Sequence, residues 1–289
     1  MSKKVKEYTV CCDSADLYAW LIKDRPELPN GRDSSNYNRW VFCALEEGVV
    51  KINFVHKYSN REGYSELAGD LLKETAGTPD YILFDSLGAP LACIEDSKTA
   101  PVGNAVIQRM DKLFPLLANN KIKFPVVYIG PKSGKDESQN TERGWSQSWF
   151  YKCFAGQRKD MFKLLPPGES VCEKTFEYIL EVIIGDLKGK PVTKKGLTKG
   201  ELKTLHEGME KNIRTYKSGV FSGKLFKPDG TDAHPVQSTL MIISDVRKSL
   251  GKNPVKIKAD DLTLKKLKKS KSKRVVRVMN RNPILELKQ

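Results

Sequence analysis

Alternating apolar and polar positions divide the first half of the chain into recognisable helices and strands. A short helix pattern covers residues 13–25, and a Ser/Asp pair favours its start. Residues 39–45 and 49–58 have the composition of strands, and the turn residues 46–48 between them favour a hairpin. Leucines that share one helix face predict a helix over residues 59–76.

The centre of the chain has the clearest pattern. Residues 81–84 and 91–98 form two apolar strands, and residues 85–90 between them have turn chemistry. A helix pattern over residues 104–117 then precedes a buried strand over residues 124–129. Strand, helix and strand in this order predict a crossover connection, so part of the sheet is expected to be parallel. The fold class that follows is α/β.

A change in composition separates the last third of the chain from the rest. Residues 185–200 hold four glycines, one proline and five lysines, which favours a boundary between residues 1–185 and residues 186–289. Beyond it, helices are expected over residues 198–217 and 234–250. The C-terminal region is therefore predicted to be mainly helical.

Positive charge is concentrated in this C-terminal region. The whole chain has a formal net charge of +15, and residues 186–289 contain 26 Lys and Arg against 10 Asp and Glu. Such asymmetry is typical of a protein that binds a polyanion, and nucleic acid fits better than a membrane because no basic amphipathic helix carries bulky aromatics. The densest cluster consists of Lys265, Lys266, Lys268, Lys269, Lys271, Lys273, Arg274 and Arg277.

This basic cluster is expected to contact the DNA backbone, and its alternative is a solvated basic end without a partner. Leu262, Leu264 and Leu267 suggest a docked helix within it, and Val275–Val278 suggest a strand after it. The polar loop over residues 132–143 is a second candidate for touching DNA.

Several other classes of protein are disfavoured by the sequence. The six cysteines form no CxxC pair and the three histidines are far apart, so an ordinary zinc site is not expected and the cysteines are predicted to be reduced core residues. No apolar run is long enough to span a bilayer, and the start of the chain does not resemble a secretory signal. We therefore expect a soluble, cytoplasmic protein without a membrane partner.

Two acidic positions and one lysine carry the candidate chemistry. Asp80 opens one central strand and Asp96 closes the next, so the hairpin between them brings both carboxylates to one edge. With the carbonyl of Ser97 they offer the hard oxygen ligands that Mg²⁺ prefers. Residues two apart share a strand face, so Lys98 is expected beside Asp96, where it would aid an attacking water. Glu95 is the alternative second ligand, if a bulge exchanges the two faces.

The residues Pro79-Asp80 and Asp96-Ser97-Lys98 resemble the signature of the PD-(D/E)xK nuclease superfamily. This resemblance covers roughly residues 59–130 and implies a mixed central β-sheet flanked by helices, a restriction-endonuclease-like core. It also implies Mg²⁺-dependent hydrolysis of phosphodiester bonds. The nuclease core is therefore expected within residues 1–185, and a DNA-binding region within residues 186–289.

The same resemblance implies an acidic residue on the helix before these strands. Glu66 is the candidate, and Asp70 and Glu74 are its rivals. The length of the chain resembles that of type II restriction endonucleases, which implies a homodimer acting on double-stranded DNA, with a cognate DNA methyltransferase as a possible companion. A structure-specific or repair nuclease of the same superfamily, and a DNA- or RNA-binding protein without catalysis, are the rival hypotheses.

Overall fold

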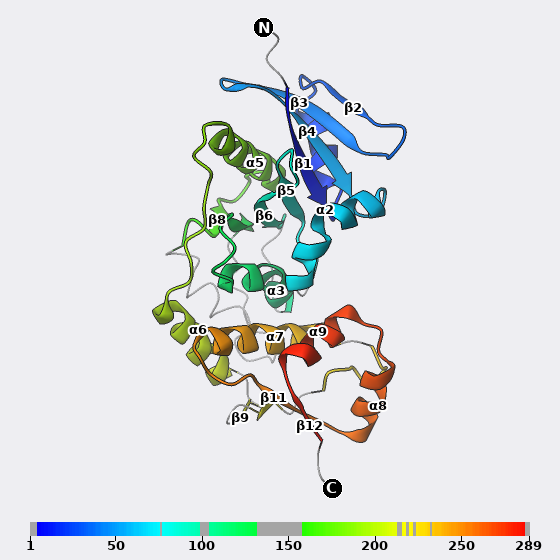
Figure 1. The fold of residues 1–289 in the computed structure, drawn as a ribbon, viewed down its shortest axis with the longest axis vertical. Helices are drawn as coiled ribbons and strands as arrows, with labels where there is room; N and C mark the ends of the chain where they lie inside the picture. The colour runs from blue at the N-terminus through cyan, green and yellow to red at the C-terminus, as the bar shows by residue number, and fades with distance from the viewer. Residues whose placement is uncertain are drawn as a thin grey trace.

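An eight-stranded mixed sheet forms the centre of the protein (Figure 1). The computed structural model describes residues 5–75, 77–98, 104–131, 158–212, 216–217, 220–221, 224–231 and 233–286. The strand order is β2-β3-β4-β1-β5-β6-β7-β8. The strands are β1 (Lys6–Cys12), β2 (Asn30–Arg32), β3 (Arg39–Leu45), β4 (Gly48–His56), β5 (Tyr81–Phe84), β6 (Pro90–Asp96), β7 (Val126–Pro131) and β8 (Phe162–Leu165). The predicted α/β class with a mixed sheet is confirmed.

The strand pairs at the centre of the sheet follow the predicted pattern. β5 and β6 are antiparallel, as expected of a hairpin, and β6 and β7 are parallel. The hairpin of β3 and β4 is also as predicted. β1 lies in the middle of the sheet, between β4 and β5, and was not predicted from the sequence. Its first two residues are charged and its last three are all buried, so its sequence lacks the regular alternation that predicts a strand.

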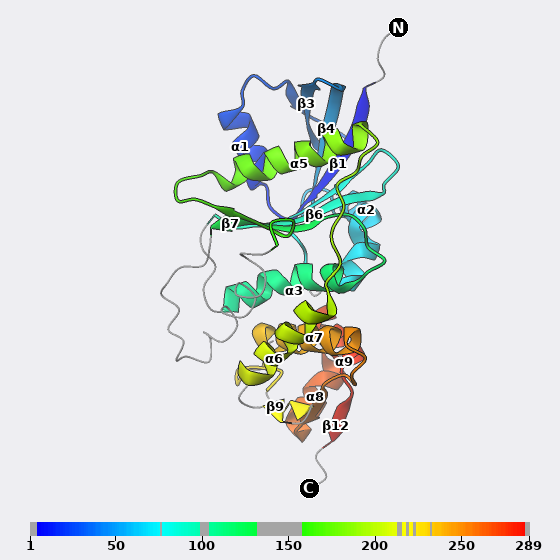
Figure 2. The same cartoon turned by 90° about the vertical axis from the view of Figure 1, so that its left-hand side faces the viewer.

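Helices cover both faces of this sheet (Figure 2). α1 and α5 lie against one face, and α2 and α3 lie against the other. The side chain of Asn60 accepts a hydrogen bond from the amide of Gly63 at the start of α2, and Ser170 does the same for Glu173 at the start of α5. These helices are α1 (Asp16–Asp24), α2 (Arg61–Glu74), α3 (Asn104–Ala118) and α5 (Val171–Leu187).

The C-terminal region continues the layered arrangement beyond α3 (Figures 1 and 2). α6, α7 and α9 form the next layer, and a four-stranded sheet with α8 lies beyond it. The elements are α6 (Lys199–Asn212), α7 (His234–Ser249), α8 (Asp261–Lys269), α9 (Lys273–Arg281), β9 (Tyr216–Lys217), β10 (Val220–Phe221), β11 (Lys256–Ala259) and β12 (Ile284–Glu286). The prediction of a mainly helical C-terminal region is confirmed.

The expected strand at the valines of the basic cluster is wrong, because these residues belong to α9. The side chain of Ser272 accepts a hydrogen bond from the amide of Val275 and begins the helix. Val275 and Val278 are three apart and both buried, whereas Val276 is exposed. Burial of one helix face therefore outweighs the strand propensity of β-branched residues.

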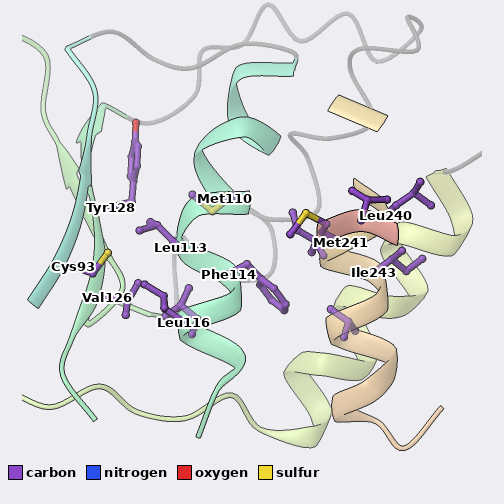
Figure 3. Packing of buried hydrophobic residues seen from close by; sticks show 14 of the residues in the cluster. Cys93, Met110, Leu113, Phe114, Leu116, Val126, Tyr128, Leu240, Met241 and Ile243 are labelled. Carbon is purple, nitrogen blue, oxygen red and sulfur yellow. The ribbon is translucent and has the colours of Figure 1, made fainter. Parts of the chain in front are cut away.

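α3 is buried on two sides and joins the sheet to the C-terminal region (Figure 3). Leu113 and Leu116 point toward the strands, where Val126 is among the residues they meet. Phe114 points the other way, toward Ile243 and its neighbours on α7. One continuous hydrophobic cluster thus runs from the main sheet through α3 to α7 and α9. The helix that carries part of the candidate site is an internal layer of the protein.

Arg158 ties the start of β8 to the C-terminal region. Its guanidinium forms two hydrogen bonds of 2.9 Å to Asp160, one of 2.8 Å to Glu201 on α6 and one of 2.7 Å to the carbonyl of Lys195. The Arg158 side chain is 9% exposed, so water cannot easily replace it.

Arg158→Met is expected to lower the free energy of unfolding by about 3 kcal/mol, because it leaves two partly buried carboxylates without their cation. Chemical denaturation monitored by circular dichroism measures this loss. Lys159→Met is the matched control, since Lys159 is an exposed neighbour of the same charge and should change stability by less than about 0.5 kcal/mol. Equal effects of the two substitutions would show that the network around Arg158 does not stabilise the fold.

Five cysteines lie within the described ranges, and all five are buried and free. This confirms the prediction of reduced core cysteines for Cys11, Cys12, Cys43, Cys93 and Cys172, while Cys153 lies outside the described residues. Among the residues that the structure describes, no helix combines the length and the apolar character that a membrane span requires.

Candidate functional site

The start of β5 and the end of β6 meet at one edge of the sheet, as the hairpin predicts. Tyr81 pairs with Ile94 in the antiparallel register, so Asp80 lies beside the end of β6. The carboxylate of Asp80 accepts a hydrogen bond of 2.9 Å from the backbone amide of Asp96. Asp80 thus lies at the edge between the two faces of β6, with Glu95 on one face and Asp96 on the other.

On the α3 side of β6, Asp80 and Glu95 share two cations. Arg109 Nη1 lies 3.0 Å from Glu95 Oε1 and 3.9 Å from Asp80 Oδ2. Lys112 Nζ lies 2.7 Å from Glu95 Oε1 and 3.7 Å from Asp80 Oδ1. Arg109 and Lys112 are three residues apart and therefore share one face of α3. Two carboxylates from adjacent strands are held together by an ammonium and a guanidinium from one helix.

Glu95 is fully buried, yet only one of its oxygens has a partner. Oε1 accepts hydrogen bonds from Arg109 and Lys112, whereas Oε2 has no hydrogen-bond partner among the described residues. Burial raises the pKa of Glu95 to about 8, and the charge of Asp80 acts in the same direction. A buried carboxylate oxygen without a partner is rare and calls for a ligand or a proton.

Lys112 is the cation closest to both carboxylates. Burial alone would lower the pKa of its ammonium, but the charges of Glu95 and Asp80 outweigh burial and raise the pKa above its usual value. Lys112 is therefore a stable positive charge at this site. Arg109 and Lys112 were not predicted as site residues from the sequence. The signal available was a pair of basic residues spaced for one face of a helix that is mostly apolar.

Asp96 and Lys98, the favoured pair from sequence, lie toward α1 and α5 instead. Thr175 Oγ1 on α5 donates a hydrogen bond of 3.1 Å to Asp96 Oδ2, and Lys98 Nζ lies 3.0 Å from Asp16 Oδ2 on α1. Burial raises the pKa of Asp96 to about 7, and the charge of Asp80 adds to this effect. Lys98 is exposed and lines a hollow of about 460 Å³ between α1 and α5.

The two backbone carbonyls at the end of β6 lie close to neighbouring elements. The carbonyl of Asp96 accepts a hydrogen bond of 2.8 Å from Arg109 Nη1. The carbonyl of Ser97, which the sequence suggested as a metal ligand, lies against β7, where a Cβ on Gly130 would approach it to 2.8 Å. Gly130 has a φ of +159°, and this close approach explains why a residue without a side chain stands there.

The acidic residues of α2 do not reach this site among the described side chains. Glu66 is exposed, and Asp70 is exposed and pairs with Lys73 at 2.5 Å. The side chain of Glu74 lies outside the described residues. Neither Glu66 nor Asp70, the two predicted α2 acids whose side chains are described, is therefore part of the arrangement around Asp80 and Glu95.

The predicted DNA-binding residues divide into two groups. Lys265, Lys268 and Lys269 on α8 and Lys271 after it are exposed, and Lys266 is half-buried. We refer to these five lysines as the basic surface. Arg274 and Arg277 on α9 contact the rest of the protein: Arg274 pairs with Asp111 at 3.3 Å, and Arg277 donates a hydrogen bond to the carbonyl of Thr75. The side chain of Lys273 and the loop over residues 132–143 lie outside the described residues.

Within the described ranges, no three His, Cys, Asp or Glu side chains form a ready-made metal-binding group. Asp80 and Glu95 share two cations, and the second oxygen of Glu95 is one of the buried polar atoms without a hydrogen-bond partner among the described residues. Two carboxylates with water and phosphate oxygens suffice for Mg²⁺, so these residues fit that ion. The chain matches no family model, no curated protein and no solved structure in comparisons with known proteins.

Proposed function

We propose that this protein is a Mg²⁺-dependent nuclease that hydrolyses phosphodiester bonds in double-stranded DNA. One observation carries the proposal: the buried carboxylate of Glu95 lies beside Asp80, shares two cations with it, and keeps one oxygen without a partner among the described residues. A divalent cation needs a carboxylate oxygen that is not already hydrogen-bonded, and Glu95 Oε2 offers one next to Asp80.

Asp80 and Glu95 are the residues that would hold Mg²⁺. When bound, Mg²⁺ supplies a Lewis acid that activates water and offsets negative charge on the phosphate. Asp80 is already oriented by its hydrogen bond from the amide of Asp96. Glu95 is oriented by Arg109 and Lys112, both of which are less than one-third exposed.

Lys112 and Arg109 have a second task in this proposal. Both cations lie within 4 Å of both carboxylates and would border a phosphate group placed at the site. Fixed positive groups at this position stabilise the charge that grows on phosphate oxygens during attack by water. Lys112 thereby takes the role that the sequence signature assigns to Lys98.

DNA is the proposed substrate because the C-terminal region carries a large excess of positive charge. Residues 186–289 contain 26 basic against 10 acidic residues, and the basic surface on α8 is open to solvent. Backbone phosphates bind such lysines with little dependence on sequence. The form of nuclease that we propose is a homodimeric type II restriction endonuclease in the cytoplasm, since a large C-terminal region is left for recognition, with a DNA methyltransferase for the same site.

The test is incubation of the purified protein with supercoiled plasmid, first with Mg²⁺ and then with EDTA in excess. Discrete fragments that disappear with EDTA support a restriction endonuclease, because cleavage then depends on both the metal and the sequence. Nicks or smears support a structure-specific or repair nuclease with the same chemistry. Retardation of the plasmid in a gel without any cutting would refute the catalytic proposal and leave a DNA-binding protein.

A further inference from the structure

α9 contacts two of the three segments that form the candidate site. Arg277 Nη1 donates a hydrogen bond to the carbonyl of Thr75, in the segment that leads to Asp80. Arg274 Nη1 lies 3.3 Å from Asp111, the residue next to Lys112 on α3. One short helix of the C-terminal region therefore holds both the approach to Asp80 and the turn of α3 that carries Lys112.

The approach to Asp80 is fixed from both ends. Thr75 is buried and donates a hydrogen bond of 2.6 Å to the carbonyl of Gly77. Lys57 donates a hydrogen bond of 2.9 Å to Thr78 and one of 2.7 Å to Asp13. The backbone amide of Asp13 in turn donates a hydrogen bond of 2.9 Å to the carbonyl of Asp80. The main sheet secures the later part of this segment. Arg277 secures its beginning.

Asp111 on α3 is held by side chains from both α7 and α9. The carboxylate of Asp111 is fully buried and accepts a hydrogen bond from Ser238 on α7, and Ser238 in turn accepts a hydrogen bond of 3.1 Å from Arg274. Breaking a buried pair of this kind disturbs the residues around it. Asp111 is therefore the point at which α7 and α9 fix the orientation of α3.

These contacts converge at Gly77. A Cβ on Gly77 would lie 3.1 Å from Lys112 Cγ and 3.6 Å from Arg274 Nη2. The loop before Asp80, the lysine of the site and the arginine of α9 thus lie in direct contact at one place. A shift of α9 cannot leave the position of Lys112 or Asp80 unchanged.

α9 is also directly connected to the basic surface. α8 ends at Lys269 and α9 begins at Lys273, so only three residues separate the helix that faces solvent from the helix that holds the site.

We propose that Arg274 and Arg277 are positioning residues: by holding Asp111, Ser238 and Thr75 they fix the geometry of Lys112 and Asp80. This inference rests on the proposed nuclease function. It replaces the expectation that the two arginines contact DNA themselves, because their guanidinium groups are engaged with Asp111, Ser238 and Thr75. The basic surface is then responsible for affinity, and α9 for the arrangement of the site.

The proposal is tested by comparing Arg277→Met and Arg274→Met with the double variant Lys268→Met/Lys269→Met on α8. The α9 variants are expected to lose about 10- to 100-fold in kcat, the usual cost of removing a residue that orients a site, with KM changed by less than about twofold. The α8 variant is expected to raise KM and leave kcat near the wild-type value. Arg277→Lys, which keeps one donor for Thr75, should recover most of the lost kcat.

Two further measurements do not depend on turnover. Mn²⁺ binding followed by electron paramagnetic resonance should weaken about tenfold in Arg277→Met and stay unchanged in the α8 variant. Amide hydrogen exchange of residues 77–80 and 109–112 should quicken in both α9 variants. A wild-type protein that neither cuts DNA nor binds Mn²⁺ would refute the proposed function, and the exchange data would still decide the role of α9. Unchanged exchange, or a rise in KM at constant kcat, would overturn the positioning role.

Discussion

Replacing Glu95 with glutamine is expected to lower the rate of Mg²⁺-dependent DNA cleavage by about 100- to 1,000-fold, the loss typical of removing one preorganised charged group from an active site. Glutamine keeps the size of the side chain and one carbonyl oxygen. It removes the negative charge that a divalent cation needs and leaves Lys112 and Arg109 with Asp80 alone. Single-turnover cleavage of a plasmid measures the effect on chemistry.

Asp96→Asn is the matched control for this substitution. Asp96 also has a raised pKa and a position next to Asp80, but its carboxylate faces Thr175 on α5, away from Lys112. It should retain most of the wild-type rate. A larger loss in Asp96→Asn than in Glu95→Gln would return the second metal ligand to Asp96 and contradict the site described above. Gel retardation and thermal unfolding of both variants separate a loss of chemistry from a loss of binding or folding.

Lys112→Met is expected to lower kcat by about 100-fold, since it removes the ammonium closest to both carboxylates. Lys98→Met should have little effect, because Lys98 is exposed and its partner is Asp16 on α1. Cleavage rates measured at saturating Mg²⁺ and DNA make the comparison. Both substitutions remove one lysine, so a general effect of charge on DNA binding cannot separate them.

Lys112→Arg tests whether the loss of activity in Lys112→Met comes only from a disturbed structure. Arginine keeps the positive charge between Asp80 and Glu95, so the variant should fold and bind DNA, and it should recover part of the lost rate. A Lys98→Met protein that is inactive while Lys112→Met cleaves normally would reverse the assignment of the two lysines.

Much of the central unit could be predicted because its signals are local. The strands β5, β6 and β7 and the helix α3 each carry their own apolar pattern, and the turn before β6 contains Gly88 in a left-handed conformation. The hairpin alone was enough to predict that Asp80 and the end of β6 lie side by side at one edge of the sheet. β1 was missed because its central place depends on pairing with two strands that lie far along the chain.

The face of the site could not be predicted in the same way. Alternation along β6 shows that Glu95 and Asp96 point to opposite faces, but it does not show which face meets α3. That depends on the crossover of α3 and on the packing of α5, which comes 75 residues after Asp96. The inward orientation of Arg274 and Arg277 depends likewise on the docking of α9. The basic residues around them in the sequence do not indicate that these two side chains point inward.

The double burial of α3 has a consequence for how this protein could evolve or be re-engineered. A domain that is joined to its neighbour only by a linker can be exchanged without disturbing the core of either. Here Phe114 and its neighbours on α3 would be bare without α7. The C-terminal region therefore cannot be exchanged as a separate module, since any replacement must also cover this face of α3 and complete the interior of the protein.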